Sequence, residues 1–146
     1  MVVQERSATV QRLQDEVWGQ GNLDAIDELM SADFTRHGPA IEGGLIQGRE
    51  AFKHLVSMYR TALPDLKASM EAQVVDGDTT VTRWTARATN QGPLLGTAPT
   101  GKPIQVAGVY IHRFEGGRIA EEWVYYDTLG FLEQLGLVLL PGPDGG

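Results

Sequence analysis

The periodicity of the apolar residues changes once along this chain, at Pro64. Before Pro64, apolar side chains recur every three or four residues, as on one face of a helix, and after it they alternate with polar ones, as on strands. Helices followed by strands favour an α+β fold over a parallel α/β sheet. The sequence therefore predicts a single α+β domain over residues 1–137 and a flexible C-terminal tail at 138–146, where Pro and Gly are frequent.

Three helices are predicted before Pro64. The first carries Val10, Leu13 and Val17 at helical spacing, after Ser7, whose residue type often caps a helix start. The third ends just before Pro64, because proline cannot continue a helix. The predicted helices cover residues 7–18, 22–30 and 48–62, and residues 34–41 are predicted as a short strand or loop.

Four strands are predicted after Pro64. Two turns, at Asp76-Gly77-Asp78 and Glu115-Gly116-Gly117, supply residues that adopt positive φ, so the strands that they join should pair antiparallel. Segment 90–103 is too long for a tight turn, and it is either mobile or the wall of a site. The predicted strands are residues 66–75, 79–89, 104–114 and 119–126, followed by a short helix at 128–135.

Composition and charge exclude several classes of protein. The chain of 146 residues has no cysteine, which rules out disulfides and thiolate metal sites. A formal net charge of −7 leaves no basic surface for nucleic acid or for an anionic membrane. No apolar run reaches the length of a signal peptide or a membrane span. We therefore expect no nucleic-acid or membrane partner, and a cytoplasmic location.

Several segments, in their order and spacing, resemble one known family. They are WGQGNLDAIDELMSADFTRHGP after the first helix, TNQGPLLGTAPTGKPI in the long loop and YIHRFEGGRIAEEWVYYDTLGFLEQLG at the last hairpin. Over nearly all of residues 7–137 the chain is similar to the SnoaL-like polyketide cyclase branch of the nuclear-transport-factor-2-like superfamily. The resemblance implies a cone-shaped, strongly curved, mostly antiparallel sheet, wrapped by three N-terminal helices around an apolar pocket for a small hydrophobic molecule. It also implies a homodimer through the outer sheet face.

The resemblance further implies an acid–base pair in the last hairpin. Cyclases of this branch carry one polar member of the pair on each strand, and anchoring on Arg113 and Trp123 puts these two positions at Tyr110 and Val124. Valine cannot transfer a proton, and a tyrosine phenol ordinarily has a pKa near 10. In this register the usual base of an aldol-type cyclase is therefore missing.

Four residues are candidate catalytic groups. His37, at a position similar to those where the branch carries a cavity-facing histidine, is either a general base or an ordinary loop histidine. Asp127 either transfers protons or caps the helix that follows it. Arg83, where the branch often has arginine, either holds a substrate oxygen or faces solvent. Tyr110 is expected to help Arg83 to stabilise developing negative charge.

Five residues are candidates for substrate binding. Trp18 and Tyr59 lie on apolar helical faces and are either plain core or pocket wall. His112 should point the same way as Tyr110, because side chains alternate along a strand. Leu95 belongs to the long loop that is expected to shape the cavity together with Trp123.

The last strand has two faces, and only one can line a pocket. The face with Trp123 carries a carboxylate at its end and is interpreted as the site. The same alternation holds on the predicted strand 79–89, so Trp84 should pack outward if Arg83 reaches the cavity. The first face comprises Glu121, Trp123, Tyr125 and Asp127, and the second comprises Glu122, Val124 and Tyr126.

Two functions fit these features. One is a cofactor-independent acid–base enzyme, a cyclase, isomerase or hydrolase, that acts on a small hydrophobic carbonyl, ester or epoxide. The other is a non-catalytic module on the same fold that binds a small molecule or supports assembly. The sequence has no phosphate-binding glycine loop, nucleophile elbow or histidine pair at metal spacing, so we expect no cofactor and no metal.

Overall fold

A computed structural model describes residues 2–143 of the chain. Six strands form one sheet in the order β2-β1-β6-β5-β4-β3, and every neighbouring pair is antiparallel except β1 and β6, which run parallel. The sheet is therefore mostly antiparallel, as predicted. The strands are β1 (Met30–His37), β2 (Leu45–Gln47), β3 (Lys67–Asp76), β4 (Thr79–Thr89), β5 (Pro103–Glu115) and β6 (Arg118–Tyr126).

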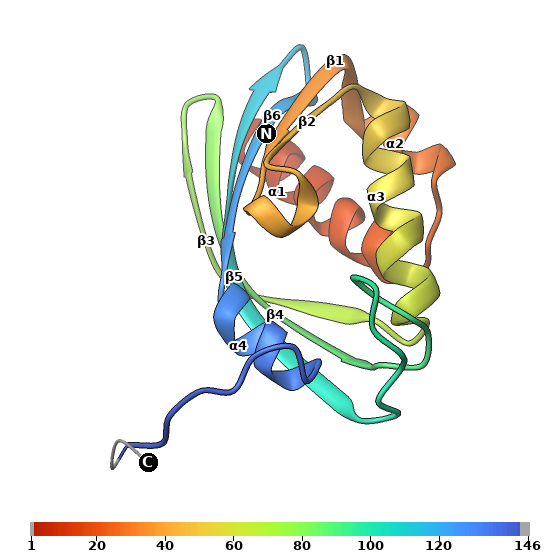
Figure 1. Cartoon of the computed structure of the whole chain (residues 1–146). Coiled ribbons are helices and arrows are strands. Elements are labelled where there is room, and N and C mark those ends of the chain that lie inside the picture. The colour runs from red at the N-terminus through yellow and green to blue at the C-terminus, as the bar shows by residue number, and fades with distance from the viewer. Residues whose placement is uncertain (1, 144–146) are drawn as a thin grey trace.

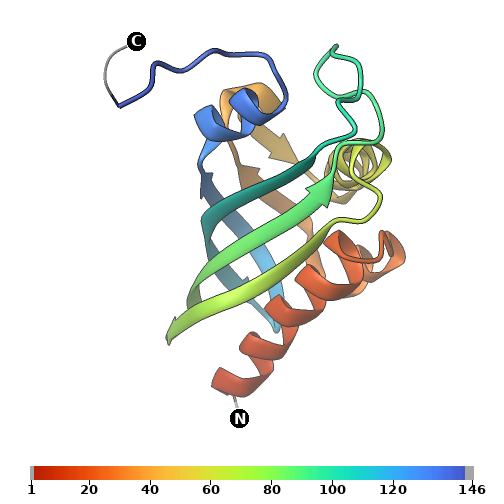
Figure 2. The same cartoon turned by 90° about the horizontal axis from the view of Figure 1, so that it is seen from below.

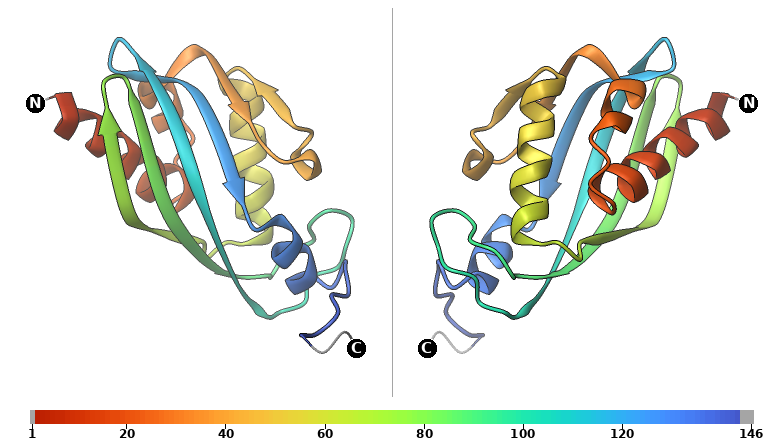
Figure 3. Two further views of the ribbon diagram at one scale, coloured as in Figure 1. Left: turned by 90° about the vertical axis from the view of Figure 1, so that its left-hand side faces the viewer. Right: turned by 90° about the vertical axis from the view of Figure 1, so that its right-hand side faces the viewer.

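The helices cover one face of this sheet (Figure 1). Two side views show the bare outer face of the sheet and, from the opposite direction, the helices in front of it (Figure 3). Seen from below, the long strands curve around the helices (Figure 2). The helical elements are α1 (Val2–Arg12), the π-helix η1 (Leu13–Trp18), α2 (Asp24–Leu29), the 3-10 turn η2 (Ala40–Glu42), α3 (Arg49–Ala62) and α4 (Thr128–Gln134).

The core lies between the helices and the concave face of the sheet. Helix α3 buries Phe52, Leu55, Val56 and Tyr59, whose spacing of three and four residues puts them on one face. Inward residues of β1, such as Phe34, pack against this helical face, since the rings of Phe34 and Phe52 lie 5.1 Å apart. Within the described residues, no helix is long and apolar enough to cross a membrane.

The predicted α+β class and the curved, mostly antiparallel sheet are confirmed, but the first third of the chain differs from prediction. The first helix begins at Val2, so Ser7 lies inside it and does not cap it. Segment 34–41 was predicted as a short strand or loop, yet β1 is an eight-residue strand that pairs with a neighbour on each side. Strand β2 was not predicted, because three residues show no periodicity.

The C-terminal tail is only partly covered by the structure. Residues 138–143 form neither helix nor strand. The remaining residues of the predicted flexible tail, 144–146, lie outside the described residues.

Gly108 makes room for two aromatic side chains at the centre of the sheet. It lies on β5 between its cross-strand partners Trp84 and Tyr126. A Cβ atom at this position would lie 2.5 Å from Trp84 Cζ2 and 2.6 Å from the carbonyl oxygen of Tyr125, which is closer than real Cβ contacts.

We therefore expect Gly108→Ala to lower the free energy of unfolding by about 1–3 kcal/mol, as overpacking of a core does. Urea unfolding followed by circular dichroism measures this change. The neighbouring Ala107 is exposed, so Ala107→Val is the matched control and should change the unfolding free energy by less than about 0.5 kcal/mol. Equal stability of the Gly108→Ala variant and the wild type would contradict the packing described here.

Candidate active site

A cavity opens between α3, α4 and the concave face of β3 to β6. About 620 Å³ of space in it is not filled by protein atoms, and part of that space is continuous with solvent. Most of its wall is apolar. The aliphatic lining residues are Leu63, Leu66, Ala68, Ala86, Ala88, Ile104, Val106 and Val124, and the aromatic ones are Trp18, Tyr59, Trp84, Tyr110, Tyr126 and Phe131.

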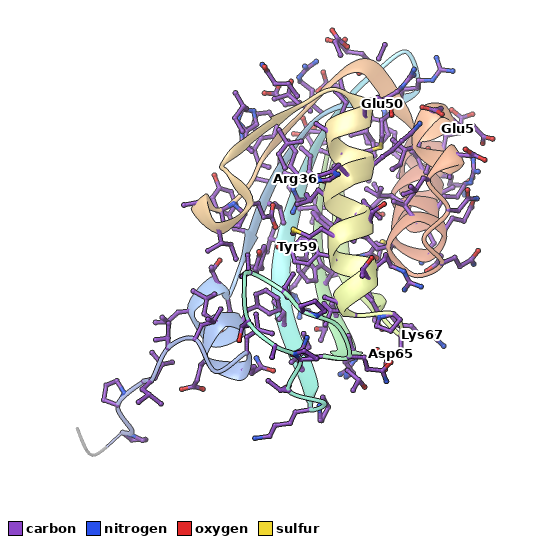
Figure 4. All side chains as sticks on the ribbon, turned by 45° about the vertical axis from the view of Figure 1, so that its right-hand side comes forward. Glu5, Arg36, Glu50, Tyr59, Asp65 and Lys67 are labelled. Carbon is purple, nitrogen blue, oxygen red and sulfur yellow. The ribbon has the colours of Figure 1, made fainter. Side chains whose placement is uncertain are left out.

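Arg36 is the centre of a polar network at one end of this cavity. It comes from β1, where alternation points it inward, and it is 2% exposed. In Figure 4, Arg36 and Tyr59 lie on the side of α3 that faces the sheet. The Arg36 guanidinium donates from Nη1 to Glu122 Oε2 at 2.5 Å and from Nη2 to Glu42 Oε1 at 2.9 Å. One buried cation therefore bridges two carboxylates.

Glu42 is the carboxylate of this network that lines the cavity. The turn η2 carries it back over the end of β1, and Gly38 permits this approach, because a Cβ there would lie 2.6 Å from Glu42 Oε1. The phenol of Tyr59 donates to Glu42 Oε2 at 2.7 Å and that of Tyr126 donates to the same oxygen at 3.0 Å. Every hydrogen-bonding neighbour of the Glu42 carboxylate among the described residues is thus a donor.

Glu122 and His112 lie behind Arg36, away from the cavity. Both are fully buried, and His112 Nε2 lies 2.7 Å from Glu122 Oε1. Because burial opposes ionisation but Arg36 and the His112 hydrogen bond favour it more strongly, the pKa of Glu122 falls below its ordinary value. Glu122 is therefore ionised at neutral pH, and its charge holds Arg36 in place.

The three cavity tyrosines are held in their neutral form. Burial, followed by the charge of Glu42, raises the pKa of Tyr59 and of Tyr126 well above the ordinary value. Burial and the charge of Glu122 do the same to the pKa of Tyr110. These phenols keep their protons throughout the biological pH range, so they act as hydrogen-bond donors and not as bases.

The structure brings three of the predicted site residues into the cavity. Trp18, Tyr59 and Tyr110 all line it. Tyr110 pairs across the hairpin with Val124, which also lines it, so the two positions implied by the family's acid–base pair do face the cavity. His112 points inward as expected, but it lies behind Arg36 and is not part of the wall.

The expectation that His37 faces the cavity is wrong. Strand β1 pairs in parallel with β6 so that Arg36 lies opposite Glu122 and His37 opposite Trp123, on the outer face. The ring of His37 stacks on that of Trp123 at 5.0 Å, and its Nε2 lies 2.6 Å from Glu121 Oε2. Trp123 therefore lies outside the cavity too, and the face of β6 interpreted as the site is the outer one.

Arg83, Trp84 and Leu95 also differ from expectation. Arg83 is exposed on the outer face of β4, while Trp84 points inward and stacks on Tyr110 at 5.2 Å. Side chains alternate along β4 as expected, but the residues that face inward are those expected to face outward. Leu95 sits at a turn with φ of 53° and packs partly on the core, but it is not a lining residue of the cavity.

Asp127 is a helix cap on the surface. Its side chain accepts a hydrogen bond from the Gly130 backbone N–H at 3.0 Å at the start of α4, and the residue is exposed. We expect Asp127→Ala to lower the free energy of unfolding by about 1 kcal/mol, the usual value of an N-cap. Asn caps as well as Asp, so Asp127→Asn should unfold at nearly the wild-type urea concentration. A loss of ligand binding or turnover in Asp127→Asn would contradict this structural role.

Arg36 and Glu42 were not predicted as site residues, and Glu122 and Tyr126 were assigned to the face of the last strand that was not interpreted as the site. For Arg36 the sequence did hold a signal. Side chains alternate along a strand, so a strand that buries Phe34 also turns Arg36 inward and His37 outward. Glu42 had no such signal, because only the three-dimensional path of the η2 turn brings it to Arg36. Within residues 2–143, no group of three histidine or acidic side chains gathers in a geometry that could hold a metal ion.

Comparisons with known proteins agree on one family. The family model described as SnoaL-like polyketide cyclase matches residues 8–135. No curated protein matches the sequence. A protein from Catenulispora acidiphila with a ketosteroid isomerase-like fold is 20% identical, with a TM-score of 0.74 over 89% of this chain and 93% of its own, so the chain shares this fold.

Three solved structures are similar over nearly their whole length. A candidate SnoaL-like polyketide cyclase from Jannaschia sp. CCS1 is 25% identical, with a TM-score of 0.84 over 93% of this chain and 94% of its own. A candidate polyketide cyclase from Acidithiobacillus ferrooxidans is 28% identical, with a TM-score of 0.83 over 92% and 96%. IdmH, a candidate polyketide cyclase from Streptomyces antibioticus, is 30% identical, with a TM-score of 0.78 over 90% and 98%.

Proposed function

Because the chain belongs to the SnoaL-like polyketide cyclase family, we propose that it is a cofactor-independent acid–base catalyst of the cyclase or isomerase type. Its substrate is a small hydrophobic carbonyl compound that enters the apolar cavity. The observation that supports this most is the position of Glu42, a carboxylate at the polar end of an otherwise apolar wall, within hydrogen-bond distance of two neutral phenols.

In the proposed reaction, Glu42 removes a proton from the carbon next to the substrate carbonyl. The electron pair of the broken C–H bond moves onto the carbonyl oxygen, and the phenols of Tyr59 and Tyr126 donate hydrogen bonds to the enolate that forms. The enolate then either takes the proton back at another carbon, which is isomerisation, or attacks a second carbonyl, which closes a ring. In ring closure the proton held by Glu42 neutralises the new alkoxide, so the carboxylate is restored.

Arg36 acts through Glu42 in this scheme. Its three hydrogen bonds to Glu42 fix the carboxylate in one orientation, and its hydrogen bond to Glu122 fixes the guanidinium in turn. Tyr110 and Trp84 form a stacked pair in the cavity wall that a planar substrate can contact.

The experiment that tests the proposal is incubation of the purified protein with aryl methyl ketones, 1,3-diketones and aromatic β-keto esters. Liquid chromatography with mass spectrometry separates isomers and cyclised products from substrate. The expected result is conversion of at least one class well above the buffer rate. The alternative function, binding without turnover, is favoured by Val124, which cannot transfer a proton at a position of the family's acid–base pair. Tight binding of a probe that is recovered unchanged after long incubation would support that alternative.

We also propose a homodimer through the outer face of the sheet. A mostly apolar hollow there is lined by Ile111, Trp123 and Tyr125, with Thr79 and Arg113 as its polar members, and Tyr125 is 64% exposed. The ion pair of Arg113 with Glu121 puts both signs of charge beside it, so the same face of a second copy is electrostatically compatible.

Light scattering at tens of micromolar should therefore give the mass of a dimer. Tyr125→Arg places a charge in the centre of this face, and we expect it to shift the protein to the monomer at the same concentration. Phe131 is buried in the cavity wall instead, so Phe131→Leu is the control that should remain dimeric. A wild-type mass equal to one chain would refute the proposed dimer.

A further inference from the structure

The aromatic side chains of the cavity form a continuous belt. Successive ring centroids lie between 5.2 and 6.3 Å apart from Trp18 through Tyr59, Phe131, Tyr126 and Trp84 to Tyr110. The face of the first ring is already occupied, because the Arg36 guanidinium lies 5.7 Å from its centroid. The other five rings line the cavity, and the faces of aromatic rings attract positive charge.

The buried charges beside this belt do not cancel. Arg36 is the single cation of the network, and it pairs with two carboxylates, Glu42 and Glu122. His112 Nε2 lies 2.7 Å from Glu122 Oε1, while its Nδ1 is buried without a partner among the described residues. Counted formally, one guanidinium against two carboxylates leaves an excess of one negative charge.

Two further observations agree with a negative interior. Nearby carboxylates raise the pKa of the phenols of Tyr59, Tyr110 and Tyr126. The charge of Arg36 offsets this effect in part at Tyr110 and Tyr126. Arg87 also borders the cavity, but it lies between inward-facing Ala86 and Ala88 on β4 and is exposed, so its side chain leaves on the other face.

We propose that the cavity selects ligands by charge and takes small organic cations with apolar substituents, such as substituted ammonium groups, in preference to their neutral and anionic isosteres. The aromatic belt contacts the substituents, and the unbalanced carboxylate compensates the positive charge. This goes beyond the proposed function, because it concerns the charge of the ligand and holds whether or not a reaction follows.

The test uses three molecules of nearly equal shape that differ in charge: choline, 3,3-dimethylbutan-1-ol and 3,3-dimethylbutanoate. Their dissociation constants for the wild-type protein are measured by calorimetry at pH 7 and low salt. We expect choline to bind roughly tenfold more tightly than the alcohol, as desolvated cation–π contacts allow, and the carboxylate to bind more weakly than the alcohol. Equal affinities, a preference for the carboxylate, or no choline binding at tens of millimolar would overturn the proposal.

Two variants locate the binding. Trp84→Leu removes a ring of the belt and should weaken choline binding several-fold more than alcohol binding. Trp123→Leu changes the hollow on the outer face and should leave both affinities unchanged. Loss of choline binding in Trp123→Leu but not in Trp84→Leu would move the site to the outer face and refute the proposal. Because no turnover is measured, failure here is distinct from failure of the proposed catalysis.

Discussion

Replacing Glu42 by glutamine should lower turnover by about 10²–10⁴-fold, the usual contribution of a general base. Glutamine keeps the size of the side chain and can still accept hydrogen bonds from Tyr59 and Tyr126. It cannot take a proton from carbon, so the loss should appear in kcat, while the dissociation constant of an unreactive ligand changes little. The rate on any substrate found in the ketone and ester panel measures this effect.

The outer face of the sheet supplies a matched control for this variant. Glu121 is also a carboxylate, hydrogen-bonded to His37 at 2.6 Å, but it lies on the outer face of the sheet, outside the cavity. We expect Glu121→Gln and His37→Ala to react at rates within about threefold of the wild type, because neither residue lines the cavity. Wild-type activity in Glu42→Gln, together with a large loss in His37→Ala, would move the chemistry to the outer face.

Replacing Glu122 by glutamine should cost about 3–5 kcal/mol of unfolding free energy at pH 7, as removal of one partner from a buried ion pair does. Glu122 and Arg36 are almost fully buried, so the variant leaves the Arg36 charge compensated by Glu42 alone. Urea unfolding measures the change. Glu121→Gln is again the control, since its ion pairs are partly exposed and should contribute no more than about 1 kcal/mol.

The effect of Glu122 should depend on pH in a definite direction. Its pKa in the folded protein lies below the ordinary value of 4.5, so its stabilising contribution is complete above that pH and is lost as the pH falls through the folded-state pKa. The difference in stability between the wild type and Glu122→Gln should therefore be constant from pH 6 to 8 and shrink below about pH 4.5. A difference that grows on acidification would contradict the assigned charge state.

The long strands could be predicted from the sequence because the turns between them have strong local signals. The glycines after Asp76 and Glu115 adopt positive φ and set two hairpins, so β3 to β6 were predicted with ends displaced by one residue at most. Strand β1 was underestimated because its partner β6 is about ninety residues away and the pairing is parallel, so no local turn marks it.

The candidate site could be predicted only in part, because the sequence does not show which set of alternating strand side chains faces the interior. Alternation shows which side chains of β6 share a face, but it does not show which face is concave. Both faces carry aromatic residues and a glutamate, and the face with Glu121 and Trp123 was interpreted as the site because it ends in the carboxylate of Asp127. The parallel pairing with β1 decides the matter, because it puts Arg36 beside Glu122 in the interior.

The central claim, that Glu42 moves a proton at a carbon next to a carbonyl, can be measured directly without knowledge of the natural substrate. The measurement is the exchange of the C–H protons next to the carbonyl of 2-tetralone in D₂O, followed by proton nuclear magnetic resonance. The wild type should exchange these protons well above the buffer rate, His37→Ala should match it, and Glu42→Gln should exchange no faster than buffer. Exchange by Glu42→Gln at the wild-type rate, or none by the wild type, would contradict the account.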